Sequence, residues 1–187
     1  MTFGDIIYLL AISLELLLLP LLAIYIISIT ISWLYGAPYV VTRKDELNEL
    51  VEKAKKYLTK NAQFIELGCG DGRITRMVVR DYGMKGVGYD INPLLIFVAR
   101  LLTRFQHLPQ AQFHKKNVLE VDLSQADVIY LYLLPPIILE MKNKLLKPGK
   151  KDVLIISHAF KIPYLEKYLI DQVDGVKFKT YYYNRSK

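Results

Sequence analysis

A glycine-rich run, ELGCGDGR at residues 66–73, constrains the fold of this chain more than any other feature. It follows the short apolar segment Gln63–Leu67, a predicted strand, and precedes Ile74–Tyr82, whose apolar spacing predicts a helix. Glycines in such a turn adopt positive φ and let a ligand approach the backbone closely. A strand, a glycine turn and a helix in this order are typical of an open α/β sheet that binds its ligand at the carboxyl ends of the strands.

Strand-like and helix-like segments alternate along the rest of the chain, which predicts a doubly wound, mostly parallel sheet. Asp174-Gly175 is a strong hairpin signal and predicts a terminal antiparallel hairpin. The expected strands are Gln63–Leu67, Lys85–Tyr89, Ala111–Lys115, Asp127–Leu133, Val153–Ser157, Lys167–Val173 and Val176–Tyr183. The expected helices are Ile74–Tyr82, Pro93–Phe105, Pro135–Leu146 and an amphipathic helix that Thr42 caps and that reaches Leu58.

The N-terminal segment is almost wholly apolar. A helix needs about 20 apolar residues to cross the hydrocarbon layer, and Leu16–Tyr35 has that length without a charge. We therefore predict a membrane anchor over residues 1–36, with the span at 16–35, and a globular domain over residues 37–187. Glu15 is expected near the outer interface because a charge inside the bilayer is costly. Pro20 is expected to bend the first turns of the span.

The formal net charge of +7 is unevenly distributed. All 25 lysines and arginines lie at or after Arg43, and the only charged residues before it are Asp5 and Glu15. Positive charge stays on the cytoplasmic side of membrane helices, so we predict a single-pass protein with its N-terminus outside and its globular domain in the cytoplasm. A basic domain is compatible with anionic lipid, nucleic acid or an acidic protein as partner. A cleaved signal peptide is disfavoured because the segment lacks a basic start and a small-residue cleavage site.

Three acidic residues favour a cationic ligand over a dinucleotide. Asp90 ends the second predicted strand, 22 residues after Gly68, and a carboxylate at about that spacing grips ribose hydroxyls. Glu66 and Asp71 add negative charge where a pyrophosphate would be repelled, and Arg73 stands where dinucleotide binders carry their third glycine. An ammonium and a sulfonium suit such a pocket, so these residues predict S-adenosylmethionine as the cofactor.

The runs ELGCGDGR and VGYDINP resemble the first two motifs of class I S-adenosylmethionine-dependent methyltransferases. The resemblance implies that Gly68, Gly70 and Gly72 line the methionine end of the cofactor and that Asp90 holds its ribose. It also implies further cofactor-binding residues in the two motifs and after the third strand. These are Glu66, Cys69, Asp71, Ile91 beside the adenine, Asn92, Asn117 at the adenine amino group, and Val118.

A narrower resemblance runs from about residue 38 to the C-terminus. PYVVT at 38–42, GYDINPLL, LLPP and SHAF resemble a group of protein-lysine N-methyltransferases that includes the enzymes acting on the ATP synthase c subunit and the adenine nucleotide translocase. A small archaeal lysine methyltransferase belongs to the same group. The Pro-aromatic-Val stretch of that group covers the cofactor, which implies a role for Tyr39 and Val40, although Val41 replaces a frequent proline. The group implies a lysine in a protein substrate, here a membrane-associated one.

The fourth predicted strand ends in YLYLLPP at residues 130–136. By the same resemblance we expect Tyr132, Pro135 and Pro136 to form the wall of a lysine channel; the alternative for Tyr132 is packing in the core. His158 ends the fifth strand and is a candidate for touching the substrate or moving a proton, although a structural hydrogen bond is the commoner role. His107 and His114 show no metal-ligand spacing, so no metal is expected.

Three other functions stay open at this point. A methyltransferase acting on a lipid or small molecule at the membrane surface fits the anchor and the basic charge equally well. A nucleic-acid methyltransferase is disfavoured because the chain lacks an Asn-Pro-Pro-aromatic motif and because a membrane anchor suits it poorly. A non-catalytic binding module is disfavoured by the intact cofactor motifs.

Overall fold

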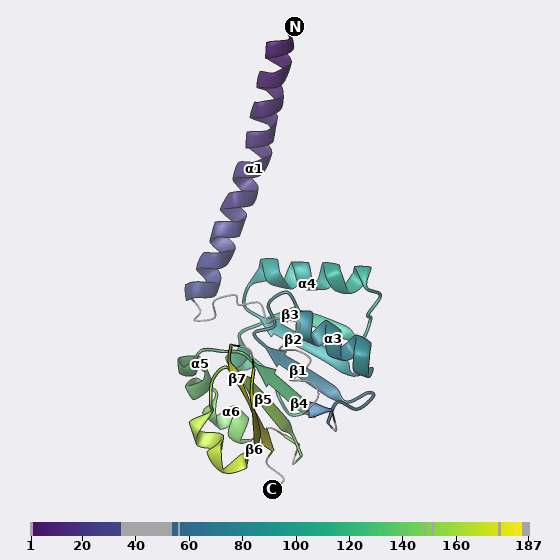
Figure 1. Cartoon of the computed structure of the whole chain (residues 1–187), viewed down its shortest axis with the longest axis vertical. Coiled ribbons are helices and arrows are strands. Elements are labelled where there is room, and N and C mark those ends of the chain that lie inside the picture. Colours follow the sequence, from purple (N-terminus) through teal and green to yellow (C-terminus); the bar gives the residue numbers. More distant parts are fainter. Residues whose placement is uncertain are drawn as a thin grey trace.

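The computed structural model describes residues 2–34, 54–55, 57–147, 149–150, 152–175 and 177–184. Its centre is a seven-stranded sheet with the order β3-β2-β1-β4-β5-β7-β6 (Figure 1). The strands are β1 (Gln63–Leu67), β2 (Lys85–Asp90), β3 (Ala111–Lys115), β4 (Val128–Leu131), β5 (Leu154–His158), β6 (Leu169–Asp174) and β7 (Lys179–Asn184). The helices are α1 (Phe3–Leu34), α3 (Arg73–Tyr82), α4 (Pro93–Phe105), α5 (Pro135–Glu140) and α6 (Lys142–Leu146), with 3₁₀ turns η1 (Val118–Glu120) and η2 (Pro163–Tyr168).

The first five strands pair in parallel, which confirms the predicted doubly wound sheet. Strand β1 lies at the centre of the parallel part of the sheet, with β2 and β3 on one side and β4 and β5 on the other. The terminal hairpin is also confirmed, and β7 inserts antiparallel between β5 and β6. Both strands begin later than expected, and for β6 the reason is that the 3₁₀ turn η2 occupies the start of the predicted sixth strand.

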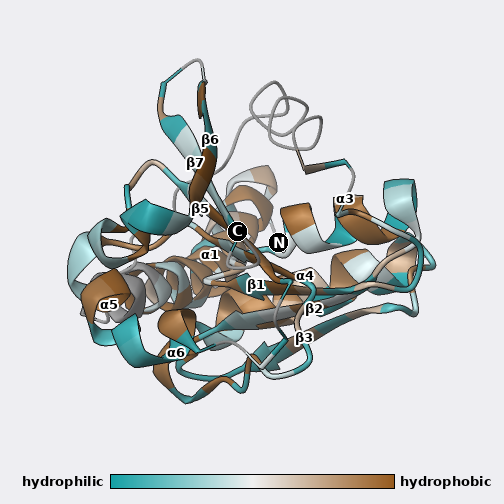
Figure 2. Ribbon diagram, turned by 90° about the horizontal axis from the view of Figure 1, so that it is seen from below, coloured by the Kyte–Doolittle hydropathy of each residue, from teal (hydrophilic) through white to brown (hydrophobic). Residues whose placement is uncertain are grey.

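Alternate strand residues pack into two layers because successive side chains point to opposite faces of a sheet. In β4, Val128 and Tyr130 pack towards α3, whereas Ile129 and Leu131 pack towards α5 and α6. The strands are therefore apolar on both faces, as expected for a sheet that helices cover on both sides. Figure 2 shows apolar residues concentrated in the sheet and on parts of the flanking helices.

Helix α4 begins and ends where the sequence predicted. Asn92 is its N-cap, and the Asn92 side chain accepts hydrogen bonds from the backbone N–H groups of Leu94 and Leu95. Pro93 stands at the first helical position, where a missing N–H costs nothing. Local chemistry therefore fixed the start of this helix.

The single predicted helix Pro135–Leu146 is instead two short helices, α5 and α6, that meet at Met141. Met141 has a ψ of 0° and is fully buried. The break keeps Ile138, Met141 and Leu145 packed in the same core layer. The need to bury these three side chains overrides the uniform helical pattern of the sequence.

The N-terminal helix α1 is continuous from Phe3 to Leu34 and runs through Pro20, so residues 6–14 extend the helix. Its length is about 48 Å at 1.5 Å per residue, which exceeds the hydrocarbon thickness of a bilayer. The stretch that could cross a membrane by length and composition is Phe3–Ser28, with a mean hydropathy of 2.5. This stretch overlaps the predicted span at 16–35, whose bounds stay a prediction, and Ser28 is buried against the globular part.

Some features predicted from the sequence lie outside the described residues. These are the break at Gly36-Ala-Pro38, the cap at Thr42, most of the amphipathic helix that follows it, and the proposed cofactor cover at Tyr39 and Val40.

The packing of Gly72 gives a first test of this fold. Gly72 has a φ of 73°, and a Cβ built on it overlaps the ring of Phe113. Gly83 has a similar φ of 64°, but its nearest neighbour is Cγ of the flexible Lys60 side chain at 3.5 Å. We expect Gly83→Ala to lower the free energy of unfolding by about 1 kcal/mol through backbone strain. We expect Gly72→Ala to lower it by about 2–4 kcal/mol, because overpacking adds to that strain.

Urea unfolding of the two detergent-solubilised variants measures the difference. Equal losses of stability for Gly72→Ala and Gly83→Ala would show that Phe113 does not fill the space beside Gly72.

Candidate active site

One edge of the sheet brings together chemistry-bearing residues from the ends of β1, β2, β4 and β5 and from the start of β7. Leu67 of β1 pairs with Tyr89 of β2 and with Leu131 of β4, and His158 of β5 pairs with Thr180 of β7. The next residues after Leu67, Tyr89 and Leu131 are Gly68, Asp90 and Tyr132. The same registers align these three residues with His158 and Thr180, so that all five form one row across the sheet. Residues in one row of a sheet point to the same face, so this row combines the glycine turn, the acid and two aromatic rings.

Asp90 is the centre of the cofactor half of this row. Its Oδ2 accepts a hydrogen bond from the Gly70 N–H at 2.8 Å, and its Oδ1 accepts one from the Asn92 N–H at 2.8 Å. Burial raises the pKa of Asp90, and these backbone donors oppose that shift. A carboxylate has about four acceptor sites, so each oxygen keeps capacity for a ligand hydroxyl. A desolvated carboxylate with free acceptor capacity suits both a ribose and a nearby cationic group.

The three glycines of the turn have different structural roles. Gly68, Gly70 and Gly72 all have positive φ, at 76°, 53° and 73°, so each needs the conformational freedom of glycine. The missing side chain of Gly72 makes room for Phe113 of β3. The space beside Gly72 therefore serves protein packing, as does the space beside Gly68, where a Cβ would lie 2.8 Å from Leu133 Cδ2.

Glu66 caps helix α3 from the neighbouring strand. The N-cap residue Gly72 has no side chain, and the Glu66 carboxylate accepts hydrogen bonds from the N–H and the hydroxyl of Thr75 at 2.9 and 2.5 Å. Glu66 is 3% exposed, and burial raises its pKa to about 8. It is therefore largely protonated at neutral pH and adds little of the negative charge that the sequence argument assigned to it.

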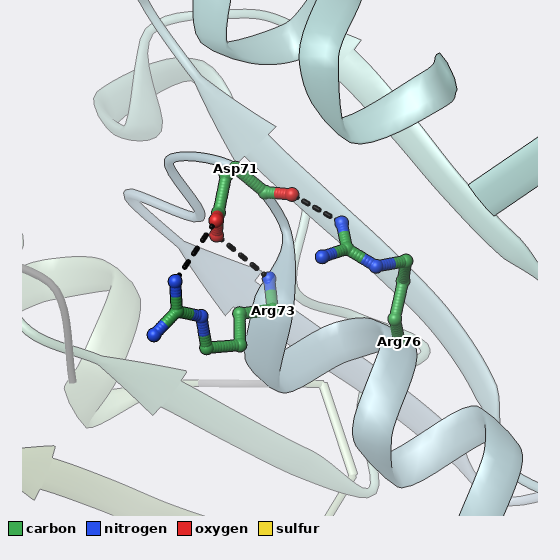
Figure 3. A network of polar contacts seen from close by, with 3 residues as sticks. All are labelled: Asp71, Arg73 and Arg76. Carbon is green, nitrogen blue, oxygen red and sulfur yellow. Dashed lines mark hydrogen bonds and ion pairs between the residues drawn. The ribbon is translucent and has the colours of Figure 1, made fainter. Parts of the chain in front are cut away.

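Asp71 is also engaged within the protein (Figure 3). Its carboxylate accepts from the Arg73 N–H at 3.1 Å and from the Arg73 guanidinium at 3.4 Å, while its carbonyl accepts from Arg76. The paired arginine offsets the negative charge predicted for Asp71. In the described part of the chain, Asp90 alone supplies the carboxylate that the charge argument for a cationic ligand requires.

The side chains of two asparagines in the predicted cofactor site form hydrogen bonds with backbone groups of the protein. The Asn92 side chain caps α4 and donates to the carbonyl oxygen and the hydroxyl of Ser28 on α1, at 2.9 and 2.8 Å. Asn117 caps the turn η1, where its Oδ1 accepts from the Leu119 N–H at 3.0 Å. Val118 is buried in the core and Ile91 is partly exposed after β2. A direct contact of these four residues with the cofactor stays a prediction.

An aromatic cluster occupies the other half of the row. The Tyr132 ring packs edge-on against His158 with centroids 4.8 Å apart, and Phe178 lies 6.2 Å from Tyr132 and 6.0 Å from His158. His158 is 1% exposed, and its Nδ1 lies 2.9 Å from the Thr180 hydroxyl. Phe178 is 41% exposed. The sequence pattern gave no sign of Phe178, because it precedes the last strand and joins the cluster only through the antiparallel β7.

The remaining predicted site residues lie around this cluster. Pro135 and Pro136 are exposed at the start of α5, two and three residues beyond Leu133, which packs beside Gly68. Cys69 is buried, and burial raises its pKa well above the ordinary value, so it is a small packing residue and not a thiolate. Within the described ranges, no group of three or more His, Cys, Asp or Glu side chains is placed to hold a metal ion.

The comparison with protein families decides what this site is. A family model described as the ANTKMT methyltransferase domain matches residues 66–168. The chain belongs to the ANTKMT methyltransferase family. The match begins at Glu66, spans the glycine turn, Asp90, Tyr132 and His158, and ends in η2.

Named relatives agree with this assignment. A "Protein-lysine N-methyltransferase" of Saccharolobus islandicus is 33% identical over 133 residues, which cover 70% of this chain and 81% of the relative. The human lysine N-methyltransferase of the ATP synthase c subunit is 23% identical over 68% of this chain and 53% of its own length. The mouse "Adenine nucleotide translocase lysine N-methyltransferase" is 27% identical over 54% of this chain and 44% of its own length. The chain thus spans about half the length of the human and mouse relatives.

A solved structure gives the same fold with a cofactor product bound. The RNA methyltransferase from Salinibacter ruber in complex with S-adenosyl-L-homocysteine has a TM-score of 0.72 and 27% identity, over 78% of this chain and 94% of that one. The predicted class I methyltransferase fold and S-adenosylmethionine as cofactor are confirmed. The observed site fits this cofactor, because the positive-φ turn at Gly68 and Gly70 lies beside a carboxylate with free acceptor capacity.

The raised pKa of Glu66 predicts an unusual pH dependence of stability. An acid whose pKa is about 8 in the folded state and 4.5 when unfolded holds its proton more tightly when folded, so this contribution is full below pH 4.5 and falls as pH rises towards 8. The slope from one group is at most about 1.4 kcal/mol per pH unit. We expect Glu66→Gln to flatten the loss of stability between pH 5 and pH 8, because the amide keeps an acceptor for Thr75.

Chemical unfolding across this pH range compares wild type with Glu66→Gln and with Glu140→Gln, which changes an exposed carboxylate on α5. Parallel pH profiles for wild type and Glu66→Gln would contradict the buried, protonated state of Glu66.

Proposed function

We propose that this methyltransferase methylates a lysine side chain of a membrane-associated protein. The observation that carries the proposal is the row at the carboxyl edge of the sheet. In this row the rings of Tyr132 and His158 lie next to the glycine turn. Phe178, directly before β7, completes the aromatic cluster. Relatives named as lysine methyltransferases support the same substrate class.

Aromatic walls suit a lysine substrate for two reasons. Ring faces attract an ammonium group, and the apolar ring bodies pack against the four methylenes of the side chain. The bound cofactor supplies an electrophilic methyl group, and the attacking amine must be neutral. A free lysine has a pKa of about 10.4, so only about one in a thousand is neutral at pH 7. Desolvation in the channel lowers the pKa of the amine and raises the neutral fraction, which opposes the preference of the ring faces for the charged form.

His158 acts in this proposal as a positioning residue. Its Nδ1 is bonded to Thr180, and its ring packs edge-on against Tyr132 and Phe178. A ring held on three sides fixes the orientation of Tyr132. Of the two roles expected from the sequence, we therefore propose the structural hydrogen bond for His158 and not proton transfer.

The membrane location is part of the proposal. Helix α1 is apolar and long enough to cross a bilayer, and every lysine and arginine follows it in the sequence. The positive-inside rule then favours an outside N-terminus and a cytoplasmic catalytic domain. A span at Phe3–Ser28 brings Glu15 near its middle, whereas a span at 16–35 leaves it at the outer interface. An acid at that depth is costly and favours a role in contacting another membrane protein.

Labelled methyl transfer tests the substrate class. Full-length protein is added to native membranes with S-adenosylmethionine carrying a labelled methyl group, and protein, lipid and RNA are separated. We expect label in protein, recovered as methyl-lysine after hydrolysis. Label in the lipid extract or in RNA would refute the lysine assignment and support the two alternative substrates, of which RNA is also the substrate named for the Salinibacter ruber relative.

Asp90→Asn is the control for the cofactor site. Hydrogen bonds to a charged group contribute about 1.5–3 kcal/mol, so we expect cofactor binding to weaken roughly tenfold to a hundredfold in calorimetry. Thermal unfolding checks that the variant still folds, because Asp90 also holds the Gly70 and Asn92 N–H groups. Wild-type affinity in a folded Asp90→Asn protein would remove Asp90 from the cofactor site.

Phe178→Ala tests the aromatic channel. We expect KM for a lysine substrate to rise roughly tenfold with cofactor affinity unchanged, because one aromatic contact to a cation contributes about 0.5–2 kcal/mol. Leu139→Ala removes a similarly exposed apolar side chain from α5 and serves as the matched control. An unchanged KM in Phe178→Ala would place the lysine channel elsewhere.

A further inference from the structure

Helix α4 carries an exposed apolar stripe. Phe97, Leu101 and Phe105 recur every four residues and are 61%, 41% and 73% exposed. Residues four apart share one face of a helix. The opposite face packs on the sheet through the buried Ile96 and Ala99. Two phenylalanines and a leucine on one solvent-facing stripe form an apolar patch of the kind that marks an interaction surface.

The position of α4 favours a membrane as the partner of this stripe. Ser28, the last residue of the candidate membrane span, is bonded to Asn92, the N-cap of α4. The start of α4 is therefore tied to the end of the span. Figure 1 shows α4 lying across the end of the globular part from which α1 rises. The surface of a bilayer crossed by α1 therefore lies at the level of α4.

The charge around α4 also fits a membrane with anionic lipids. The sequence from residue 91 to residue 119 contains no aspartate or glutamate but has Arg100, Arg104, Lys115 and Lys116. A groove of about 740 Å³ runs between α4 and the edge strand β3. Its lining includes Arg100, Arg104, His107 and His114. Nε and Nη2 of Arg100 donate to the Phe113 carbonyl at 2.9 and 2.7 Å, so a lipid phosphate in the groove would meet the remaining N–H groups of Arg100 and the guanidinium of Arg104.

We propose that the outer face of α4, defined by Phe97, Leu101 and Phe105, lies in the headgroup layer of an anionic membrane, with Arg100 and Arg104 beside lipid phosphates. This second membrane contact rests on the membrane placement of α1 in the proposed function. A single span leaves the domain free to rotate about the membrane normal and to tilt, whereas α1 and α4 together fix its orientation. The cofactor acid Asp90 lies two residues before the N-cap of α4, so the same contact holds the active site at the membrane surface.

Depth-dependent quenching in vesicles tests this contact with the full-length protein. Cysteine variants Phe105→Cys, Lys142→Cys and Leu22→Cys each carry an environment-sensitive dye, and the buried Cys69 reacts poorly because burial raises its pKa. The protein is reconstituted into phosphatidylcholine vesicles with about 30% phosphatidylserine and with spin-labelled lipids as quenchers. Cofactor binding, measured on the same samples, reports separately on the active site.

We expect headgroup-level quenchers to act on the dye at residue 105 and not on the dye at residue 142, which lies on α6, and deep quenchers to act on the dye at residue 22. Quenching at residue 22 without quenching at residue 105 overturns the α4 contact and leaves the proposed function intact. A dye at residue 22 that stays unquenched overturns the membrane span and with it the α4 contact.

A charge reversal supplies the second measurement. Arg104→Glu, combined with a dye at Leu101→Cys, should reduce quenching in phosphatidylserine vesicles, and Lys142→Glu is the matched control on α6. Equal quenching in Arg104→Glu and Lys142→Glu would show that the arginine does not meet anionic lipid.

Discussion

The two hydrogen bonds of the Asp90 carboxylate hold the active site together. One oxygen accepts from Gly70 in the cofactor turn, and the other accepts from Asn92 at the start of α4. Asn92 in turn bonds Ser28 at the end of the apolar helix α1. A single buried carboxylate therefore connects the cofactor turn, the end of β2, the next helix and the segment that precedes the catalytic domain.

This connection links the candidate site directly to the apolar helix α1. Ser28 of α1 is bonded to Asn92, and the Asn92 N–H is bonded to Asp90, the candidate cofactor acid. The aromatic half of the site is built differently, from the ends of β4, β5 and β7, and depends on strand register instead of on hydrogen bonds. The cofactor half and the substrate half can therefore be perturbed separately by substitution.

Much of the fold could be predicted because its signals are local. The glycine turn, the N-cap at Asn92 with Pro93 after it, and the Asp174-Gly175 hairpin each specify backbone geometry over a few residues. The α5–α6 break and the late start of the last hairpin could not be predicted, because they depend on how Met141 and the η2 turn pack against distant strands. The contact of Ser28 with Asn92, 64 residues away, could not be predicted for the same reason.

The sequence by itself determined the fold class and the cofactor and gave Asp90 as the candidate cofactor acid, since these follow from residue types at fixed spacing along one strand–turn–helix unit. Only the tertiary structure decided which of the three motif acids keeps a carboxylate with free acceptor capacity. Glu66 and Asp71 stand in the same motif as Gly68, but Glu66 is buried under Thr75 and Asp71 is paired with Arg73. The tertiary structure also added Phe178 to the site and Phe113 to the glycine turn. Charge and burial depend on neighbours in space, and spacing along the chain does not specify those neighbours.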